Sequence, residues 1–422
     1  MVPFFYKSAL ILMVVMSSVI MACDKADTAI APQDLELTPN ELSMVKQSNE
    51  FAWKLYEHAL SSLKSDENAM LSPLSVQAAL AMTWQGARAS TREAMAEALG
   101  LSDFETEDIN AYFKKLISDL PNLDPRTKLD IANSIWYRQQ FQVLPEFLDV
   151  NQQFFQAEVH ALDFNQPTAV DQINQWVSDQ THQKIEKIVQ QLDGNLVMLL
   201  INAVYFKGDW EQKFDPEATY SDVFHHGSDA THIIHADYMK IEHTFPYRQG
   251  PDYDAVELPY GNKKYSMLAI RPKDGISITD LMVQFRDPQV WKESFQSSSM
   301  FSRKMILSFP KFTFSYANTL NDELSALGMG VAFSPAADFS GISTQGPLEI
   351  SEVKHKTFIE VNEAGTEAAA VTSVGIVLTS MPAQPFELKF DKPFLFVIRE
   401  VSSGLILFMG QLNNPQSENT EL

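Results

Sequence analysis

The stretch from residue 363 to residue 378 constrains this chain most, because it has the composition of a β-strand without the large side chains of a core strand. It reads E-A-G-T-E-A-A-A-V-T-S-V-G-I-V-L, and no charged residue separates Glu367 from Glu387. In a strand every second side chain shares one face, and here small side chains precede larger apolar ones. The pattern predicts a segment that enters an existing sheet late, between two strands already in place. That face carries Thr366, Ala368, Ala370, Thr372, Val374, Ile376 and Leu378.

Length and charge set the class of protein. With 422 residues and 45% apolar content the chain can bury a large core, and no change of composition marks an internal linker between residues 41 and 415. We therefore expect one domain over 41–415 and a disordered tail over 416–422. The net charge of −22 excludes nucleic acids and anionic polysaccharides as partners, because like charges repel.

The N-terminal residues have the pattern of an export signal. Lys7 precedes a short apolar core from Ala9 to Met16. Ala22, a small residue, then stands just before Cys23, the single cysteine of the chain. This arrangement resembles the lipobox of bacterial lipoproteins, which implies cleavage after residue 22 and acylation of Cys23, for example with palmitate. Residues 23–40 are polar and contain two prolines, so they predict a flexible tether. The expected location is the bacterial cell envelope, periplasmic or surface face, with a plain secretory signal and a secreted protein as the alternative.

Hydrophobic periodicity predicts helices mainly in the first half and strands mainly in the second, which indicates an α+β fold. Residues 197–206 are apolar on both faces and predict a central strand. Ser72 followed by Pro73 predicts a helix start, with serine as N-cap. The other predicted helices span 41–63, a short stretch around Arg92, 105–120, 145–155, 169–189, 281–295 and 320–327; the other strands span 129–137, 158–164 and much of 224–408.

Enzyme signatures with usable spacing are absent from the sequence. There is no nucleophile elbow, no metalloprotease motif and no phosphate-binding glycine loop. A group of five histidines within 19 residues could in principle bind Zn²⁺, although a solvated hairpin is the simpler interpretation. We therefore expect no enzyme, no cofactor and no metal site. These histidines are His225, His226, His232, His235 and His243, with Asp229 and Asp237 nearby.

Six motifs, taken in order along residues 41–415, resemble the serpin family of serine protease inhibitors. The resemblance implies a single-domain fold of three β-sheets and about eight or nine helices, with an exposed reactive-centre loop at about 363–385. It also implies a monomer without a cofactor, and the charge argues against activation by heparin. The motifs are N-A-M-L-S-P-L-S from residue 68, N-A-V-Y-F-K-G-D-W from residue 202, the region 327–342, His355-Lys356, V-N-E-A-G-T-E-A-A-A from residue 361, and F-D-K-P-F-L-F from residue 390.

The resemblance implies a suicide substrate for serine proteases, whose cleaved loop inserts into the main sheet. Counting along the loop places the reactive bond at Thr379–Ser380, with Leu378–Thr379 as the second choice. Neither choice supplies Arg or Lys, so elastase-like or chymotrypsin-like proteases are the expected targets. A non-inhibitory serpin that acts as a binding or carrier module is the alternative. The implied hinge is Glu363, Gly365, Thr366, Glu367, Ala368, Ala369 and Ala370, of which Thr366 is expected to wait at the edge of the gap and enter first.

Two control regions follow from the same resemblance. Beneath the main sheet, Ser72 and Ser75 are expected to lie beside a hydrogen bond between His355 and Asn202, a cluster called the shutter. At the top of the sheet, in the breach, Lys311 is expected to pair with Glu363 next to Trp210.

Overall fold

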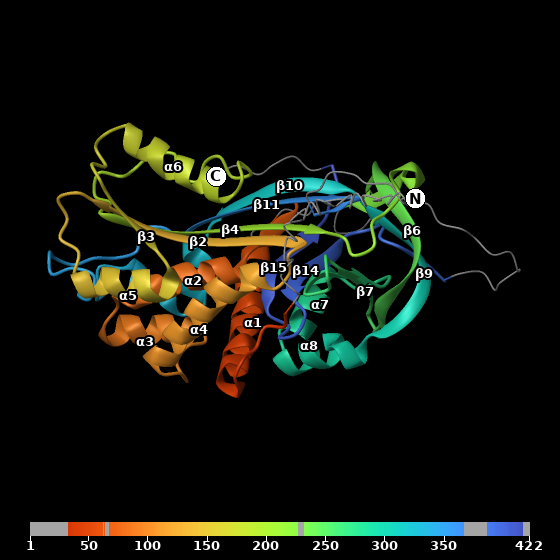
Figure 1. The fold of residues 1–422 in the computed structure, drawn as a ribbon, viewed down its shortest axis with the longest axis horizontal. Helices are drawn as coiled ribbons and strands as arrows, with labels where there is room; N and C mark the ends of the chain where they lie inside the picture. Colours follow the sequence, from red (N-terminus) through yellow and green to blue (C-terminus); the bar gives the residue numbers. More distant parts are fainter. Residues whose placement is uncertain (1–32, 62, 64–66, 227–231, 367–385, 417–422) are drawn as a thin grey trace, which may run out of the picture. The chain divides into compact units, whose positions relative to one another are not determined.

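The chain is described by a computed structural model, which defines residues 33–61, 63, 67–226, 232–366 and 386–416. These residues lie in the compact unit Ala31–Leu422. The predicted α+β class is confirmed, with nine α-helices in these ranges (Figure 1). The helices are α1 Pro39–Leu60, α2 Pro73–Trp84, α3 Ala89–Ala98, α4 Thr106–Asp119, α5 Pro145–Phe155, α6 Thr168–Gln180, α7 Ile278–Phe285, α8 Pro288–Phe295 and α9 Asn321–Ala326.

The strands build two hydrogen-bonded sets. Six form the main sheet in the order β10-β11-β12-β4-β2-β3, and nine form a second set. The strands are β1 Ala69–Leu71, β2 Thr127–Arg138, β3 Glu158–Leu162, β4 Met198–Asp209, β5 Tyr220–His226, β6 His232–Gln249, β7 Tyr253–Pro259, β8 Tyr265–Pro272, β9 Phe301–Pro310, β10 Phe312–Thr319, β11 Lys354–Asn362, β12 Gly365–Thr366, β13 Phe386–Lys389, β14 Phe394–Glu400 and β15 Ile406–Leu412.

The second set consists of two parts that meet in one long strand. Its order is β1-β15-β14-β8-β7-β6-β9-β13, and β5 pairs with β6. The first part of β6 pairs with β5 and β9, whereas its last three residues pair with β7. The two smaller sheets expected beside the main sheet are therefore only partly separated, because β6 belongs to both.

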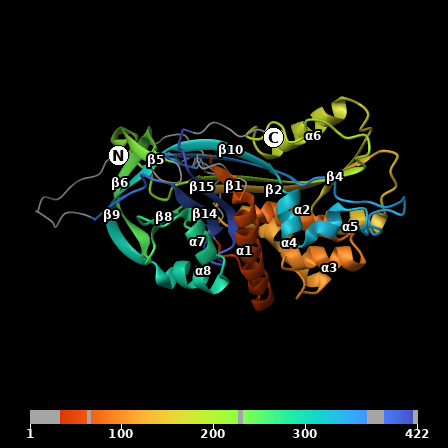
Figure 2. The same cartoon turned by 180° about the vertical axis from the view of Figure 1, so that it is seen from behind.

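The helices lie on both faces of the main sheet. α6 covers one face, and α2 to α5 lie on the other (Figures 1 and 2). Under α6, Trp176 and Ile173 pack on Trp136 of β2 and on Ile201 and Ala203 of β4. The apolar side chains on both faces of β4 thus have partners, as the sequence predicts for a central strand.

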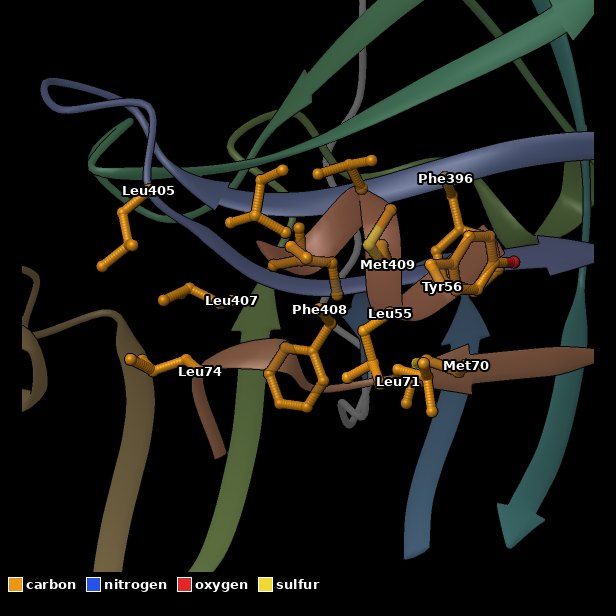
Figure 3. Packing of buried hydrophobic residues seen from close by; sticks show 14 of the residues in the cluster. Leu55, Tyr56, Met70, Leu71, Leu74, Phe396, Leu405, Leu407, Phe408 and Met409 are labelled. Atoms are coloured by element: carbon orange, nitrogen blue, oxygen red, sulfur yellow. The ribbon is translucent and has the colours of Figure 1, made fainter. Parts of the chain in front are cut away.

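The main core lies between α1, α2 and the second strand set, where β1 joins β15 (Figure 3). Ser72 forms the predicted N-cap of α2, since its hydroxyl accepts a hydrogen bond from the Ser75 N–H. This cap anchors the start of α2 at the base of the main sheet. The labelled core side chains are Leu55, Tyr56, Met70, Leu71, Leu74, Phe396, Leu405, Leu407, Phe408 and Met409.

Two boundaries differ from the sequence analysis. The helix predicted to reach residue 189 ends at Gln180, because His182 and Gln183 have positive φ angles of 51° and 63°. The predicted tether does not extend to residue 40, since Leu35 is buried and Asp34 pairs with Lys264 at 2.7 Å. The last residues before α1 are thus part of the domain.

Candidate functional site: the hinge and the gap in the main sheet

The first residues of the predicted hinge already form a strand. Gly365 and Thr366 pair with Asn362 and Val361 of β11 on one side and with Asp209 and Gly208 of β4 on the other. The side chain of Thr366 is buried, and its hydroxyl is 2.7 Å from that of Tyr260. The expectation that Thr366 waits at the edge of the gap is therefore wrong: it is already inside the sheet.

Glycine is required at position 365 by the closeness of the neighbouring strand. Its φ is +154°, and a Cβ atom there would lie 2.1 Å from the carbonyl oxygen of Gly208. Any larger residue must push β4 and β12 apart. The glycine in the motif E-A-G-T thus fixes how the hinge enters the sheet.

The breach residues come together as predicted from the resemblance. Lys311 Nζ lies 3.0 Å from Glu363 Oε1, and the Thr219 hydroxyl donates to the same oxygen at 2.7 Å. Partial burial raises the pKa of Glu363, but hydrogen bonds from Thr219 and Lys311 outweigh it, so the pKa is lowered overall. Trp210 Nε1 donates to the Asn362 carbonyl at 2.9 Å. The turn before Gly365 is therefore held at Glu363 by Lys311 and Thr219 and at Asn362 by Trp210.

The indole of Trp210 also supports Tyr260. The two rings stack with centroids 4.6 Å apart and planes at 11°. Tyr260 in turn reaches the Thr366 hydroxyl, and its burial raises the pKa of its phenol far above the usual value, so it stays neutral. Neither Tyr260 nor Thr219 was identified from the sequence, since each belongs to a segment that meets the hinge only in three dimensions.

The shutter is only partly as expected. His355 Nε2 accepts a hydrogen bond from the Ser72 N–H at 3.0 Å, and the Ser72 hydroxyl donates to the Leu407 carbonyl at 2.9 Å. Burial lowers the pKa of His355 to about 4, so the ring is neutral at pH 7. Its accepting Nε2 places the proton on Nδ1. His355 thus ties β11 to the start of α2 and to β15.

The expected hydrogen bond between His355 and Asn202 is not formed. The Asn202 amide donates instead to Asn133 Oδ1 at 2.7 Å, across the pairing of β4 with β2. Its own Oδ1 is buried and has no partner among the described residues. The reason is that β4 and β11 are separated at this level, so each side of the shutter bonds to its own neighbours.

Below β12, no backbone ladder between β4 and β11 occurs in the part of the chain that the structure describes. We call the end of this gap at Gly208 and Val361 the upper end, and the end at Met198 and Lys354 the lower end. Next to Thr366 the space between the strands is only ≈ 20 Å³. Towards the lower end it widens into a cleft of ≈ 710 Å³, lined by Asn202, His355 and mainly apolar side chains.

The segment after α6 bridges this gap on the outer face. His182 Nε2 lies 2.8 Å from Asp130 of β2, and Lys184 Nζ lies 3.6 Å from Glu360 of β11. Ile185 follows and lines the cleft. The sequence predicts a continuous helix over these residues, and this prediction does not include the two contacts across the gap.

The five clustered histidines do not assemble into one site. His226 lies opposite His232 in the β5–β6 pairing, whereas His225 and His235 have apolar partners across the ladder. His243 lies further along β6, against Phe245. Within the described ranges, no group of three or more His, Cys, Asp or Glu side chains is placed to hold a metal ion.

The remaining predicted residues lie outside the described part of the chain. They are Glu367, Ala368, Ala369, Ala370, Leu378, Thr379 and Ser380 of the loop, and Cys23 with the signal and most of the tether. Among the helices that the structure describes, none is both long enough and apolar enough to cross a membrane.

Comparison with known proteins gives consistent matches along the chain. A family model described as Serpin (serine protease inhibitor) matches residues 46–415. The chain is 35% identical over 385 residues to Iripin-2 of Ixodes ricinus, covering 88% of this chain and 94% of that protein. The native structure of tengpin, a thermophilic serpin, matches with a TM-score of 0.80 and 33% identity over 90% of this chain and 96% of its own. Human thyroxine-binding globulin matches with a TM-score of 0.80 and 28% identity, over 89% and 100%.

Proposed function

The chain belongs to the serpin family, and from this we propose that it inhibits serine proteases as a suicide substrate and is not itself an enzyme. The observation that carries the proposal is the position of Gly365 and Thr366. They form the first two residues of a strand between β11 and β4, above a gap that continues to the lower end of the sheet. A loop that begins in this way can continue into the gap once its far end is cut.

The pairing of β12 predicts where each loop residue would go. Thr366 lies opposite Gly208 and Val361, and both neighbouring strands run antiparallel to it. Each further residue of the loop would therefore meet the preceding residue of β4 and of β11. In this register Ala368 would lie opposite Phe206 and Ile359, and Thr372 would lie opposite Asn202 and His355.

The sizes of the loop residues fit the space available in this register. Ala368 and Ala370 would enter where the space is ≈ 20 Å³, whereas Val374, Ile376 and Leu378 would enter the cleft of ≈ 710 Å³. Thr372 would arrive at the level of Asn202, whose buried Oδ1 can accept a hydrogen bond from its hydroxyl. In this register both the polar and the apolar loop residues would therefore meet suitable surroundings in the gap.

Insertion of about a dozen residues can drive trapping. Each new backbone hydrogen bond contributes about 0.5–1.5 kcal/mol, and burial of the larger loop side chains adds to it. The protease first forms its ordinary acyl-enzyme with the loop. Dragging it along the sheet would distort its oxyanion hole, and the loss of one donor there slows catalysis about 10²–10³-fold. The acyl bond then persists.

The proposed reactive bond is Thr379–Ser380, with Leu378–Thr379 as the second choice. Both lie within G-I-V-L-T-S-M, which offers no basic side chain to a trypsin-like pocket. We therefore propose elastase-like and chymotrypsin-like proteases as targets of a monomer that needs no cofactor.

The test is incubation with one elastase-like, one chymotrypsin-like and one trypsin-like protease, followed by denaturing electrophoresis. The first two should give a complex that survives boiling in detergent, and mass spectrometry of the released fragment should place the new N-terminus at Ser380 or Thr379. A loop that every protease cuts while remaining fully active would contradict the inhibitory function.

The second candidate is a binding or carrier module. It is favoured by the match to thyroxine-binding globulin, whose name is that of a binding protein, and by the size of the cleft. The same incubation separates the two functions, since a carrier would be cut without forming a stable complex.

We also propose that the protein is exported and anchored to the membrane through acylated Cys23, as in bacterial lipoproteins. The support is the position of this cysteine directly after Ala22 in an apolar leader. In a bacterial host, Cys23→Ala should move the protein from the membrane fraction to the soluble fraction or stall its processing. Failure of the parent protein to incorporate labelled palmitate would exclude the anchor and leave secretion.

A further inference from the structure

Two of the clustered histidines face each other across the β5–β6 hairpin. His226 and His232 are direct cross-strand partners, and their ring centroids are 5.5 Å apart with the planes at 52°. His225 and His235 point to the other face, because neighbouring residues of a strand alternate. The fold therefore brings one pair together out of the five histidines clustered between residues 225 and 243.

We propose that His226 and His232 form a binding site for a divalent transition-metal ion such as Zn²⁺, with water completing its coordination. Two imidazoles on one tetrahedral Zn²⁺, with Zn–N bonds of about 2.0–2.1 Å, place their ring centroids roughly 5 Å apart. The observed separation is close to this value, and the tilt of the rings is incompatible with simple stacking. Only a small rotation of the side chains is needed to direct one nitrogen of each ring to a shared ion.

The surroundings of the pair favour this use. His226 Nδ1 is buried and has no hydrogen-bond partner among the described residues, which is unusual for a buried polar atom. The next residues on the same face are Phe224, which is fully buried, and its partner Ile234. These apolar neighbours restrict solvent access on one side of the pair and lower the local dielectric there. The net charge of −22 attracts cations to the protein as a whole.

Binding would link the two strands at the end of the hairpin. The ion would contact β5 and β6 at their last pair, so it would stabilise the folded hairpin relative to the unfolded chain. With two protein ligands the affinity should follow the general order for nitrogen sites, in which Cu²⁺ binds more tightly than Zn²⁺.

The experiment uses the tag-free full chain, titrated with ZnCl₂ and with CuCl₂ in a calorimeter at pH 7.5. We expect one ion per chain, a rise of the unfolding temperature with metal concentration, and nitrogen couplings from two imidazoles in the Cu²⁺ electron paramagnetic resonance spectrum. His232→Ala and His226→Ala should each weaken binding at least about tenfold, which corresponds to about 1.4 kcal/mol.

His225→Ala is the matched control, since it removes a histidine from the same strand but from the opposite face. It should bind metal like the parent. His232 is exposed, so its replacement is expected to fold normally and decides the question even if His226→Ala does not fold. The proposal is overturned if the parent binds no metal, if binding survives His232→Ala, or if His225→Ala abolishes it.

Discussion

At its upper end the gap between β4 and β11 is filled by Gly365 and Thr366 and held by hydrogen bonds and an ion pair, whereas its lower end is an open apolar cleft of ≈ 710 Å³. The upper end is tightly packed, so changes there should act on the resting fold as well as on insertion. The lower end has spare volume, and there the neutral His355 holds β11 to Ser72 at the start of α2. At the upper end the first hinge residues already pair with both strands, whereas at the lower end β4 and β11 have no ladder between them in the described part of the chain.

Thr366→Arg should give the largest effect. The arginine would have to bury an unpaired charge beside Tyr260, at a cost of several kcal/mol. Because Thr366 is already inside the sheet, we expect β12 to leave it and trapping to fail. Each ~1.4 kcal/mol added to the insertion barrier shifts the competition with deacylation about tenfold. The measurement is the number of inhibitor molecules consumed per protease inactivated.

Thr366→Ser is the matched control, because it keeps the hydroxyl that contacts Tyr260 and should behave like the parent. An unchanged ratio in Thr366→Arg would show that the upper end of the gap does not direct insertion.

Gly365→Ala should have the next largest effect. The added Cβ would collide with the Gly208 carbonyl, and overpacking of this kind costs about 1–3 kcal/mol. We expect a lower urea midpoint and a smaller yield of trapped complex. Gly330→Ala is the control, since a Cβ there meets no atom within 4 Å. Equal urea midpoints for the two variants would show that close packing of Gly365 against Gly208 does not stabilise the fold.

At the lower end of the gap, His355 should make the stability of the fold depend on pH. The pKa of His355 is about 4 in the fold and about 6.5 in an unfolded chain, so the unfolded chain binds more protons between these values. The free energy of unfolding therefore contains the full contribution of neutral His355 above pH 6.5 and loses it as the pH falls towards 4. At pH 5 the loss is about 2 kcal/mol. Urea titrations at pH 7.5 and pH 5 should show this loss in the parent.

His355→Gln should remove this part of the pH dependence, whereas His58→Gln, at a partly exposed position of α1, should keep it. A parent protein equally stable at both pH values would show that His355 is not buried in its neutral form.

Glu363→Gln should give the smallest effect. Lys311 is partly exposed, and ion pairs in such positions contribute about 0–1 kcal/mol. The lowered pKa of Glu363 means that its contribution is present at neutral pH and is lost as the pH falls below the usual range of a glutamate. The unfolding temperature should fall slightly at pH 7, and its difference from that of the parent should shrink as the pH is lowered. A loss as large as that of Gly365→Ala would show that the ion pair, and not close packing, holds the upper end.

Features that depend on residues close together in the chain could be predicted from the sequence. Ser72 and Pro73 start α2 because a serine cap and an N-terminal proline act within one helical turn. The apolar run over 197–206 predicted a central strand, which is β4, and the small side chains from Thr366 onward predicted a segment that enters a sheet. Family membership followed from such local motifs in a fixed order.

Contacts between residues far apart in the chain could not be predicted in this way, because they depend on how the strands and helices pack. The apolar period predicted helix through Val189, and Ile185 is indeed buried, but periodicity reports burial and not the backbone that achieves it. Asn202 bonds to Asn133 and not to His355 because the width of the gap, not the sequence of either strand, sets the distance. The sequence also did not show that Thr366 already lies inside the sheet. Its pairing with Gly208 depends on β4, a strand that lies far earlier in the chain.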